Sequence, residues 1–460
     1  MSLALIAGIT AGALCAPAVP ALALAQAGRV SPSPEAGTPT LLATRTTETI
    51  RQIAHCGGTM YAVGTFTKIS GSNGSFTRNN IFSFRATAPF TVTSWNPKVN
   101  GTVNTIAFSG GNCATAYIGG QFTSVGHTAV KNIAAVNTST GAVVSTFNHN
   151  AGGQVETMLA VNGHLLTGGF FKDINGSTAD PYYASLNPAT GKNDGFLHLG
   201  ISGHYVFPGV KANATEVYNQ QLSHGGTLVL VEGDFTSVGG QNRRQIFMIN
   251  VSGSTAALTG WTSPEFDGSD PGATLNANDK YFNCGDSHPF YIHAAAWSPD
   301  DQKIYLADTG VKPILWNGTP PLVGLCDAAA AFPATQGQVF HDWIAYDGCD
   351  SLYSVATGGD AVYVAGHNRW FNNQNACNKA GTGAIPAAGL AGLTPGPPGG
   401  SLILNSANTA GLYSRSRGHG ADDMLLNSDG LWIASDNFGG GTSCGGQAGF
   451  SGLCFLPFPS

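Results

Sequence analysis

Short apolar runs, separated by turns rich in glycine, asparagine, serine and threonine, follow one another along the whole chain. This pattern predicts many short β-strands rather than long helices. One run recurs seven times, and its first four copies contain the step Gly-x-Phe. Because a repeated unit in the sequence usually corresponds to a repeated unit of structure, we base the prediction of the fold on this run. The copies lie at residues 61–66, 117–122, 166–171, 230–235, 305–310, 363–368 and 432–437.

The residues around each copy predict the same four strands. An alternating apolar segment such as residues 103–106 precedes the copy, and a tight turn such as residues 162–163 makes a hairpin. A third strand follows, as at residues 132–136, and then a short fourth strand that ends on an aromatic residue such as Phe147. We expect the repeated glycine to let neighbouring sheets approach closely, and the aromatic residue to fill the wedge between them.

Four-stranded units of this kind can close into a ring, which leaves no exposed sheet edge at either end. The predicted fold class is therefore all-β: a single seven-bladed β-propeller of four-stranded antiparallel blades, preceded by a signal peptide. Six or eight blades are alternatives, because residues 263–345 are irregular. The propeller would span residues 41–460, with residues 41–48 closing the ring as the outer strand of the last blade. The blades are predicted near residues 50–97, 101–149, 153–197, 213–262, 288–345, 350–405 and 420–460.

Residues 1–27 predict a signal peptide. They form an uncharged segment rich in alanine and leucine, and they end on the small-x-small cleavage site of residues 25–27. No Lys or Arg precedes the apolar stretch, so a membrane anchor is the alternative, but breaks at Pro17 and Pro20 favour cleavage. Residues 28–40 are expected to form a flexible leader. The mature protein would then be secreted and extracellular, without a membrane span.

Eight cysteines remain once Cys15 leaves with the signal peptide, and an even number in an exported chain predicts up to four disulfides. Spacing alone does not fix their connectivity. Locality along the chain, and equivalent places in adjacent repeats, favour four pairs: Cys444–Cys454, Cys349–Cys377, Cys56–Cys113 and, by elimination, Cys284–Cys326.

Charge is scarce in this chain. Only 10% of its residues are charged, against about 25% in ordinary soluble domains, and the formal net charge is −6. The sequence contains no cluster of Lys or Arg, so a nucleic-acid partner is not expected. An apolar fraction of 42% is enough for a sizeable core, which argues against disorder.

The clearest copy of the repeat spans residues 117–137 and reads YIGGQFTSVGHTAVKNIAAVN. It resembles the repeat of secreted actinobacterial propellers, often grouped with the delta-60 and kelch-type repeat families. The C-terminal third is similar to the last blades of that group at residues 366–373, 383–386 and 417–420. The resemblance covers nearly the whole mature chain and implies a propeller. It implies no catalytic residue, because such proteins are mostly of unassigned role.

Polar and aromatic residues that could bind a ligand gather in the last three repeats. In a propeller, loops that are distant in sequence converge around one channel, and Arg, Trp and paired acids suit the recognition of sugars or carboxylates. The alternative interpretation is structural, since such residues also tie blades together and cap turns. The predicted ligand-binding residues are His341, Asp342, Trp343, His367, Arg369, Trp370, Arg415, Arg417, His419, Asp422 and Asp423.

No signature of a hydrolase, metalloprotease or phosphate loop is present, and no cofactor is predicted. A calcium site at Asp267, Asp270 and Asp279 is an alternative, although an Asp/Gly-rich turn is the simpler interpretation. We therefore expect a monomeric, non-catalytic propeller that binds an extracellular glycan, a cell-envelope polymer or a protein. The alternatives are a secreted hydrolase, lyase or oxidase acting on polysaccharide, and a scaffold for protein partners.

Overall fold

The computed structural model describes residues 29–42, 48–109, 111–204, 214–267, 290–310, 314–316, 319–358, 360–396, 399–403, 420–437, 443–444 and 447–459. Within these ranges the chain is almost entirely β. Its one helix there, α1 (Pro264–Asp267), has only four residues. The prediction of an all-β protein is confirmed.

The described strands form seven principal antiparallel sheets, which we number 1 to 7 in chain order. Each starts with an inner strand, which pairs with a second strand that carries the repeated run, and a third strand follows. Sheets 1 to 3 are β2 (Thr49–Cys56), β3 (Thr59–Thr65) and β6 (Ile81–Arg85); β7 (Thr102–Ser109), β8 (Asn112–Gln121) and β11 (Ile133–Asn137); and β12 (Gln154–Val161), β13 (His164–Phe170) and β14 (Tyr183–Leu186).

Sheets 4 and 5 have four strands, and sheets 6 and 7 have three. The four-stranded sheets are β15 (Glu216–Leu222), β16 (Leu228–Asp234), β19 (Ile246–Asn250) and β20 (Ala257–Leu258), then β21 (Tyr291–Trp297), β22 (Lys303–Thr309), β25 (Ala328–Pro333) and β26 (Trp343–Tyr346). The last two sheets are β27 (Leu352–Gly358), β28 (Ala361–Gly366) and β31 (Leu390–Leu393), then β32 (Asp423–Leu426), β33 (Gly430–Ala434) and β36 (Leu453–Pro457).

Smaller sheets lie in the connecting segments. They are formed by β1 (Thr40–Leu41), β4 (Lys68–Gly71) and β5 (Gly74–Thr77); β9 (Ser124–Val125) and β10 (Thr128–Ala129); β17 (Ser237–Val238) and β18 (Gln241–Asn242); β23 (Ile314–Trp316) and β24 (Thr319–Val323); β29 (Trp370–Phe371) and β30 (Ile385–Pro386); and β34 (Ser443–Cys444) and β35 (Gln447–Ala448).

The fourth strand is less regular than the sequence predicts. Among the described residues it is a strand only in sheets 4 and 5. The aromatic residue that follows is buried in the core, as Trp95 and Phe147 are. Sheets 1, 2, 3 and 6 hold a single bridge in its place: Phe84↔Val92, Val136↔Val143, Leu186↔Asn193 and Leu393↔Leu402.

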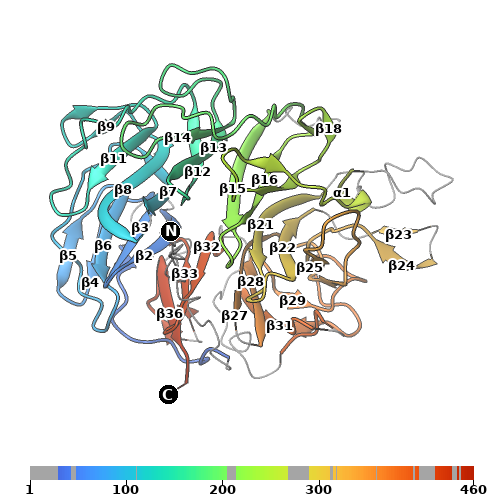
Figure 1. Cartoon of the computed structure of the whole chain (residues 1–460). Helices are drawn as coiled ribbons and strands as arrows, with labels where there is room; N and C mark the ends of the chain where they lie inside the picture. The colour runs from blue at the N-terminus through green and yellow to red at the C-terminus, as the bar shows by residue number, and fades with distance from the viewer. Residues whose placement is uncertain are drawn as a thin grey trace, which may run out of the picture.

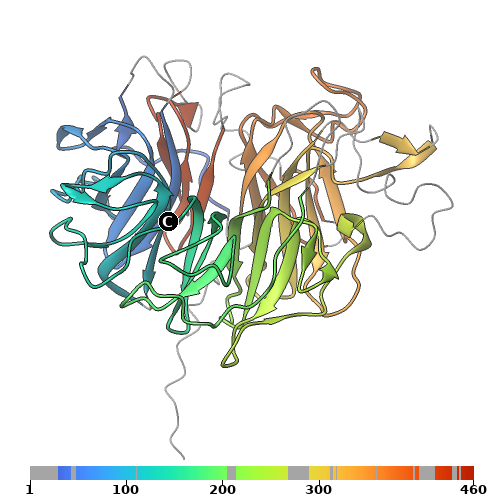
Figure 2. The same ribbon diagram turned by 90° about the horizontal axis from the view of Figure 1, so that it is seen from above.

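The seven sheets form a closed ring (Figure 1). The inner strands contact one another in chain order, and β32 of sheet 7 contacts β2 of sheet 1. Seen from the side, the strands run between two opposite faces made of loops (Figure 2). Sheets arranged around a common centre in this way define a β-propeller.

The hydrophobic core is divided among the interfaces between neighbouring sheets. Each buried cluster takes residues from two adjacent sheets, and this includes the interface between sheets 7 and 1. At that interface Trp432 stacks on Phe455 with ring centroids 4.5 Å apart, and it meets Phe90 edge-on at 5.1 Å. The ring is therefore closed by apolar packing of the kind that joins its other sheets.

The first described residues run along the outer edge of β36. The backbone N–H groups of Ser31 and Glu35 donate to the carbonyl oxygens of Pro457 and Phe455, at 2.7 and 2.9 Å. The N-terminal and C-terminal ends of the described chain are thus hydrogen-bonded to each other. Residues 41–48 are the segment expected at this edge; residues 43–47 lie outside the described residues, and Leu41 pairs with Ile69 of β4.

Three of the predicted disulfides are present: Cys56–Cys113, Cys349–Cys377 and Cys444–Cys454. The first joins the inner strand of sheet 1 to the second strand of sheet 2, whereas the other two close shorter loops. Cys326 is also disulfide-bonded, but its expected partner, Cys284, lies outside the described residues.

The repeated glycines avoid two different close contacts. In sheet 2, a Cβ on Gly119 would lie 2.3 Å from Val155 of sheet 3, so this glycine, which precedes the Gly-x-Phe step, admits the neighbouring sheet. A Cβ on the next residue, Gly120, would instead lie 2.1 Å from the carbonyl oxygen of Thr102 in the inner strand of its own sheet. For this second glycine the expectation is wrong, because the backbone it touches belongs to the same sheet.

That backbone contact coincides with a β-bulge. The register of the inner strand shifts by one residue opposite Gly120, so Asn104 has no partner in β8. The same shift recurs in sheets 1, 3, 4, 5 and 6. A Cβ would lie 2.0–2.2 Å from an inner-strand carbonyl oxygen at each equivalent glycine: Gly64, Gly169, Gly233 and Gly366.

In sheets 1, 2 and 4 the residue before the third strand ties the sheet to the next one. Asn132 has a positive φ of 64°, a conformation that asparagine tolerates better than most residues. Its N–H donates to the carbonyl oxygen of Phe122 (2.9 Å), and its own carbonyl accepts from Gly120 (3.0 Å). Its side-chain amide donates to the carbonyl oxygens of Ala151 and Gly153, which lead into sheet 3. Asn80 and Gln245 do the same after sheets 1 and 4.

We expect Gly120→Ala to lower the free energy of unfolding by about 1–3 kcal/mol, because the new methyl group must displace the backbone of the bulge. Gly58→Ala is the matched control, since a Cβ on Gly58 would meet nothing within 4 Å. Chemical denaturation of both variants measures the difference. Equal stability of the two would contradict the role of the glycine at the bulge.

Candidate functional site: the channel ring

A polar cavity of about 550 Å³ lies at the centre of the molecule. Its lining comes from the inner strands β2, β7, β12, β15, β21, β27 and β32 and the residues next to them, so every sheet contributes. A volume of this size is usual for a site that binds a small molecule.

One part of this channel, a hollow of about 170 Å³, is lined by a single residue from each sheet. Six of these residues occupy the bulges described above, and the seventh immediately precedes β32. Because a bulge re-aims a side chain, the shift of register turns these residues toward the channel. We call them the channel ring: Arg51, Asn104, Glu156, Tyr218, His293, Tyr353 and Asp422.

One half of the channel ring is charged. Burial raises the pKa of Glu156 and raises the pKa of Asp422 to about 8, while the charge of Arg51 opposes both shifts. Arg51 therefore lies near both carboxyl groups. Asn104 donates its side-chain N–H groups to the carboxylate of Glu156 (2.9 Å) and to the carbonyl oxygen of Val155 (3.1 Å). The charged half thus holds one cation, two acids and an amide.

The other half is aromatic. The ring of Tyr353 meets His293 edge-on at 4.8 Å, and on another side it meets His367 at 5.0 Å. Burial, together with the neighbouring His367, lowers the pKa of His293 to about 4. His293 is therefore neutral near pH 7. The hydroxyl of Tyr218 donates to the carbonyl oxygen of Ile292, which fixes its ring beside His293.

Further acids lie behind the channel ring in sheet 4. Burial raises the pKa of Glu216 to about 7, and the charges of Glu156 and Asp234 add to the shift. Glu232 is completely buried, and neither of its carboxylate oxygens has a hydrogen-bond partner among the described residues. Burial raises its pKa to about 8. The other repeats have Gly, Ala or Val at this position, so Glu232 is specific to sheet 4.

The structure brings two of the predicted ligand-binding residues to the channel and places a third against one of its lining residues. Asp422 belongs to the channel ring, and Asp423 lines the larger cavity, where its carboxylate accepts from the N–H of Ile53 at 2.9 Å. His367 contacts the channel ring through Tyr353.

Three others lie at the outer side of sheet 5, away from the channel. His341 pairs with Glu265 (2.8 Å), and Asp342 forms an ion pair with Lys303. Trp343 is buried, and its indole N–H donates to a carbonyl oxygen of the segment after sheet 6. These contacts match the structural interpretation. His341 also borders a separate hollow of about 600 Å³ between sheets 5 and 6.

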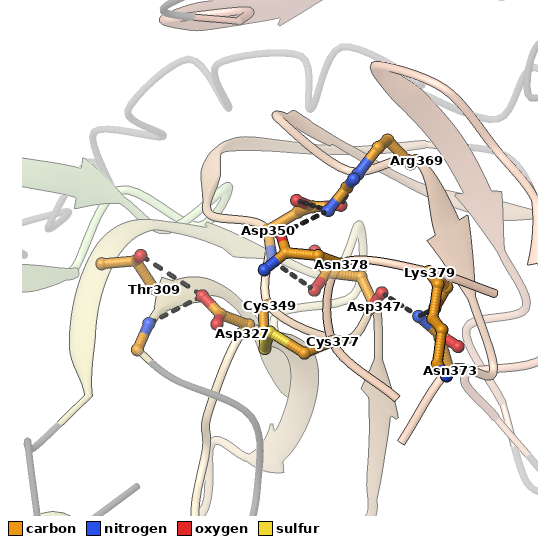
Figure 3. The surroundings of a disulfide bond; sticks show 11 residues. Thr309, Asp327, Asp347, Cys349, Asp350, Arg369, Asn373, Cys377, Asn378 and Lys379 are labelled. Atoms are coloured by element: carbon orange, nitrogen blue, oxygen red, sulfur yellow. Dashed lines mark hydrogen bonds and ion pairs between the residues drawn. A yellow bond between two sulfur atoms is a disulfide. The ribbon is translucent and has the colours of Figure 1, made fainter. Parts of the chain in front are cut away.

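Arg369 and Trp370 also have structural contacts. The guanidinium of Arg369 forms a two-pronged ion pair with Asp350, with both N–O distances 2.7 Å, and it stacks on the ring of Trp370 at 4.5 Å. Figure 3 shows this pair beside the disulfide Cys349–Cys377. The arrangement braces the loop that carries the disulfide and leaves the guanidinium occupied.

The remaining predicted residues, Arg415, Arg417 and His419, lie outside the described residues. So do Asp270 and Asp279 of the calcium prediction, while Asp267 ends α1. In the described ranges no group of three or more His, Cys, Asp or Glu side chains is placed to hold a metal ion. Those ranges also contain no helix with the length and apolarity needed to cross a membrane.

Six members of the channel ring were not predicted from the sequence: Arg51, Asn104, Glu156, Tyr218, His293 and Tyr353. A signal was available. Each of the six directly follows a buried apolar residue of its inner strand. That apolar residue pairs with the repeated glycine, or with Asp308 in sheet 5. The six residues therefore interrupt the apolar alternation at the same position of the repeat. Reading that one position across all the repeats would have found them.

No model of a known protein family matches the chain, and no curated protein matches it. The extracellular domain of a proposed one-component system from B. thetaiotaomicron aligns with 92% of this chain and 40% of its own, at 8% identity and a TM-score of 0.43. The WD40 β-propeller domain of Doa1 aligns over 92% of this chain and 97% of its own, at 10% identity and a TM-score of 0.42. The chain thus spans less than half the length of the first. No function is transferred from likenesses this distant.

Because the buried acids have raised pKa values, we expect the free energy of unfolding to fall as the pH rises. The pKa of Glu232 is raised to about 8 in the folded protein, so its contribution to stability is full below the unfolded value of 4.5 and is lost on the way to pH 8. We expect the free energy of unfolding to decrease from about pH 5 to about pH 8, and Glu232→Gln to flatten this slope. Denaturation across this range is the measurement.

The matched control for that experiment is Asp429→Asn, an exposed acid in the turn before β33. It should leave the slope as it is in the wild type. If Glu232→Gln leaves the dependence of the unfolding free energy on pH unchanged, ionisation of Glu232 does not destabilise the folded protein, and the prediction is wrong.

Proposed function

We propose that the seven sheets are the blades of a seven-bladed β-propeller, and that the protein is a secreted binding protein. Its ligand would be a sugar unit of an extracellular glycan or cell-envelope polymer, held in the channel ring. The disulfides support an exported protein, because such bonds persist in oxidising compartments. The proposed signal peptide, residues 1–27, lies outside the described residues.

The observation that carries this proposal is the composition of the channel ring. Carboxylate, amide and guanidinium groups lie on one side, and the aromatic residues Tyr218, His293 and Tyr353 lie on the other. A sugar has the complementary character, with hydroxyl groups at its rim and an apolar ring face that stacks on aromatic side chains. The proposed ligand-binding set is therefore the channel ring with His367 and Asp423.

An exposed aromatic residue supports a longer ligand. Phe170 is 45% exposed, and it pairs with Gln154 next to the bulge of Glu156. This register puts Phe170 at the same end of sheet 3 as Glu156. A second sugar unit of a polymer could stack there while the first occupies the channel.

We expect Tyr353→Ala and Asp422→Asn each to weaken glycan binding about tenfold or more, since each removes a contact that is made inside a buried site. A glycan array that includes cell-wall polysaccharides would first identify the ligand for the wild type. Titration calorimetry would then compare the variants.

Asp342→Asn is the matched control for Asp422→Asn, because Asp342 is paired with Lys303 at the outer side of sheet 5. It should bind like the wild type. An array on which the wild type captures no glycan would remove the proposal, and so would binding that Asp342→Asn weakens as much as Asp422→Asn.

One observation favours a second candidate, a secreted glycoside hydrolase. Glu156 and Asp422 line the same hollow, and burial raises the pKa of both. Glycosidases use two carboxyl groups in one pocket, of which the acid has a raised pKa. A scaffold for protein partners gains less support, because the channel face opens into a cavity rather than a flat surface.

If the protein is such an enzyme, new reducing ends should appear when it is incubated with the polysaccharide it binds. Glu156→Gln and Asp422→Asn should then each slow the reaction about a hundredfold or more. A bound polysaccharide that stays intact after long incubation would leave binding as the function.

A further inference from the structure

The channel ring presents hydrogen-bond acceptors that the described protein leaves unused. The side-chain oxygen of Asn104 and one carboxylate oxygen of Asp422 are buried and have no hydrogen-bond partner among the described residues. Both residues line the hollow of about 170 Å³. A buried acceptor without a donor is costly, so a ligand that fills this hollow should bring donors to it.

The channel also has an excess of acid. Arg51 is the only Lys or Arg among the described residues that line the larger cavity, whereas Glu156, Asp422 and Asp423 are its acids. Glu216 lies behind them, close enough to Glu156 for the two charges to interact. When these acids are ionised, one guanidinium can compensate only part of their negative charge, and burial raises the pKa of Asp422 to about 8.

From these two observations we propose that the channel ring selects a sugar that carries a protonated primary amine, such as an unacetylated hexosamine unit of a glycan. This inference rests on the function proposed above and specifies its ligand. An ammonium group is a compact cation with three donors and no acceptor, which matches a hollow lined by unused acceptors and acids.

A neutral sugar fits the same hollow less completely. Its hydroxyl groups can donate to Asn104 and Asp422, but they bring no positive charge that would compensate an ionised Asp422. An acetamide group is worse, since it replaces two donors and the charge by a carbonyl acceptor. The expected order of affinity is therefore amine, then hydroxyl, then acetamide.

The electrostatics of Asp422 agree with this order. Burial raises the pKa of its carboxyl group to about 8, Arg51 opposes the shift, and Asp436 and Asp423 add to it. A ligand ammonium next to this carboxyl group would act in the same direction as Arg51 and keep the carboxylate ionised.

The test uses three oligosaccharides of equal length and linkage, which differ only in the substituent at carbon 2 of each ring: cello-oligosaccharide with hydroxyl, chitin oligosaccharide with acetamide, and chitosan oligosaccharide with amine. Titration calorimetry with the full chain should give an affinity for the amine form about tenfold higher than for the hydroxyl form. Asp422→Asn should reduce this ratio toward one, and Asp342→Asn should keep it.

The outcomes separate this inference from the proposed function. Equal affinities for the three oligosaccharides, or a preference for the acetamide form, would overturn the inference and leave glycan binding standing. If none of them binds and the glycan array is also negative, the proposed function itself fails. A simple diamine that binds as tightly as the chitosan oligosaccharide would show attraction by charge alone, which would also overturn the selection of an amino sugar.

Discussion

The centre of this molecule depends on one backbone contact that recurs around the ring. A carbonyl oxygen of the inner strand lies where the Cβ of the second repeated glycine would be, as Thr102 lies against Gly120. The contact accompanies a bulge, and the bulge turns one side chain toward the channel. Since most sheets repeat the arrangement, their side chains meet in one hollow. Sheet 5 keeps the bulge with Asp308 in place of the glycine, where the carboxylate accepts from the N–H of Ala328.

The same geometry explains where some of the few charged residues of this protein lie. Scaffold positions are filled by apolar and small residues, and each interface between sheets has its own hydrophobic cluster. The charged side chains of the channel lie beside these clusters, where burial raises the pKa values of Glu156 and Asp422 and the charge of Arg51 opposes the shift. A cavity with few charges that interact with one another recognises a ligand by matching its donors and its charge.

Much of the fold could be predicted from the sequence, and part of the site. The repeat located the second strand of each sheet, and the cysteine positions indicated the pairs Cys56–Cys113, Cys349–Cys377 and Cys444–Cys454. For the site, attention to the irregular last three repeats found Asp422, Asp423 and His367. It missed Arg51 and Glu156, because they lie in regular repeats where a polar residue between apolar ones looks like the solvent side of a strand.

Alternation, turn residues and cysteine positions, which are local in the chain, were therefore enough to indicate the first three strands of each sheet, their order and three of the disulfides. Only the tertiary structure decided which polar residues share the channel. The reason is that a strand has a period of two, so the one-residue shift at each bulge changes the side to which the next side chain points. That shift exists only between paired strands, and the closure of sheet 7 onto sheet 1 brings Asp422 to the same hollow as Arg51.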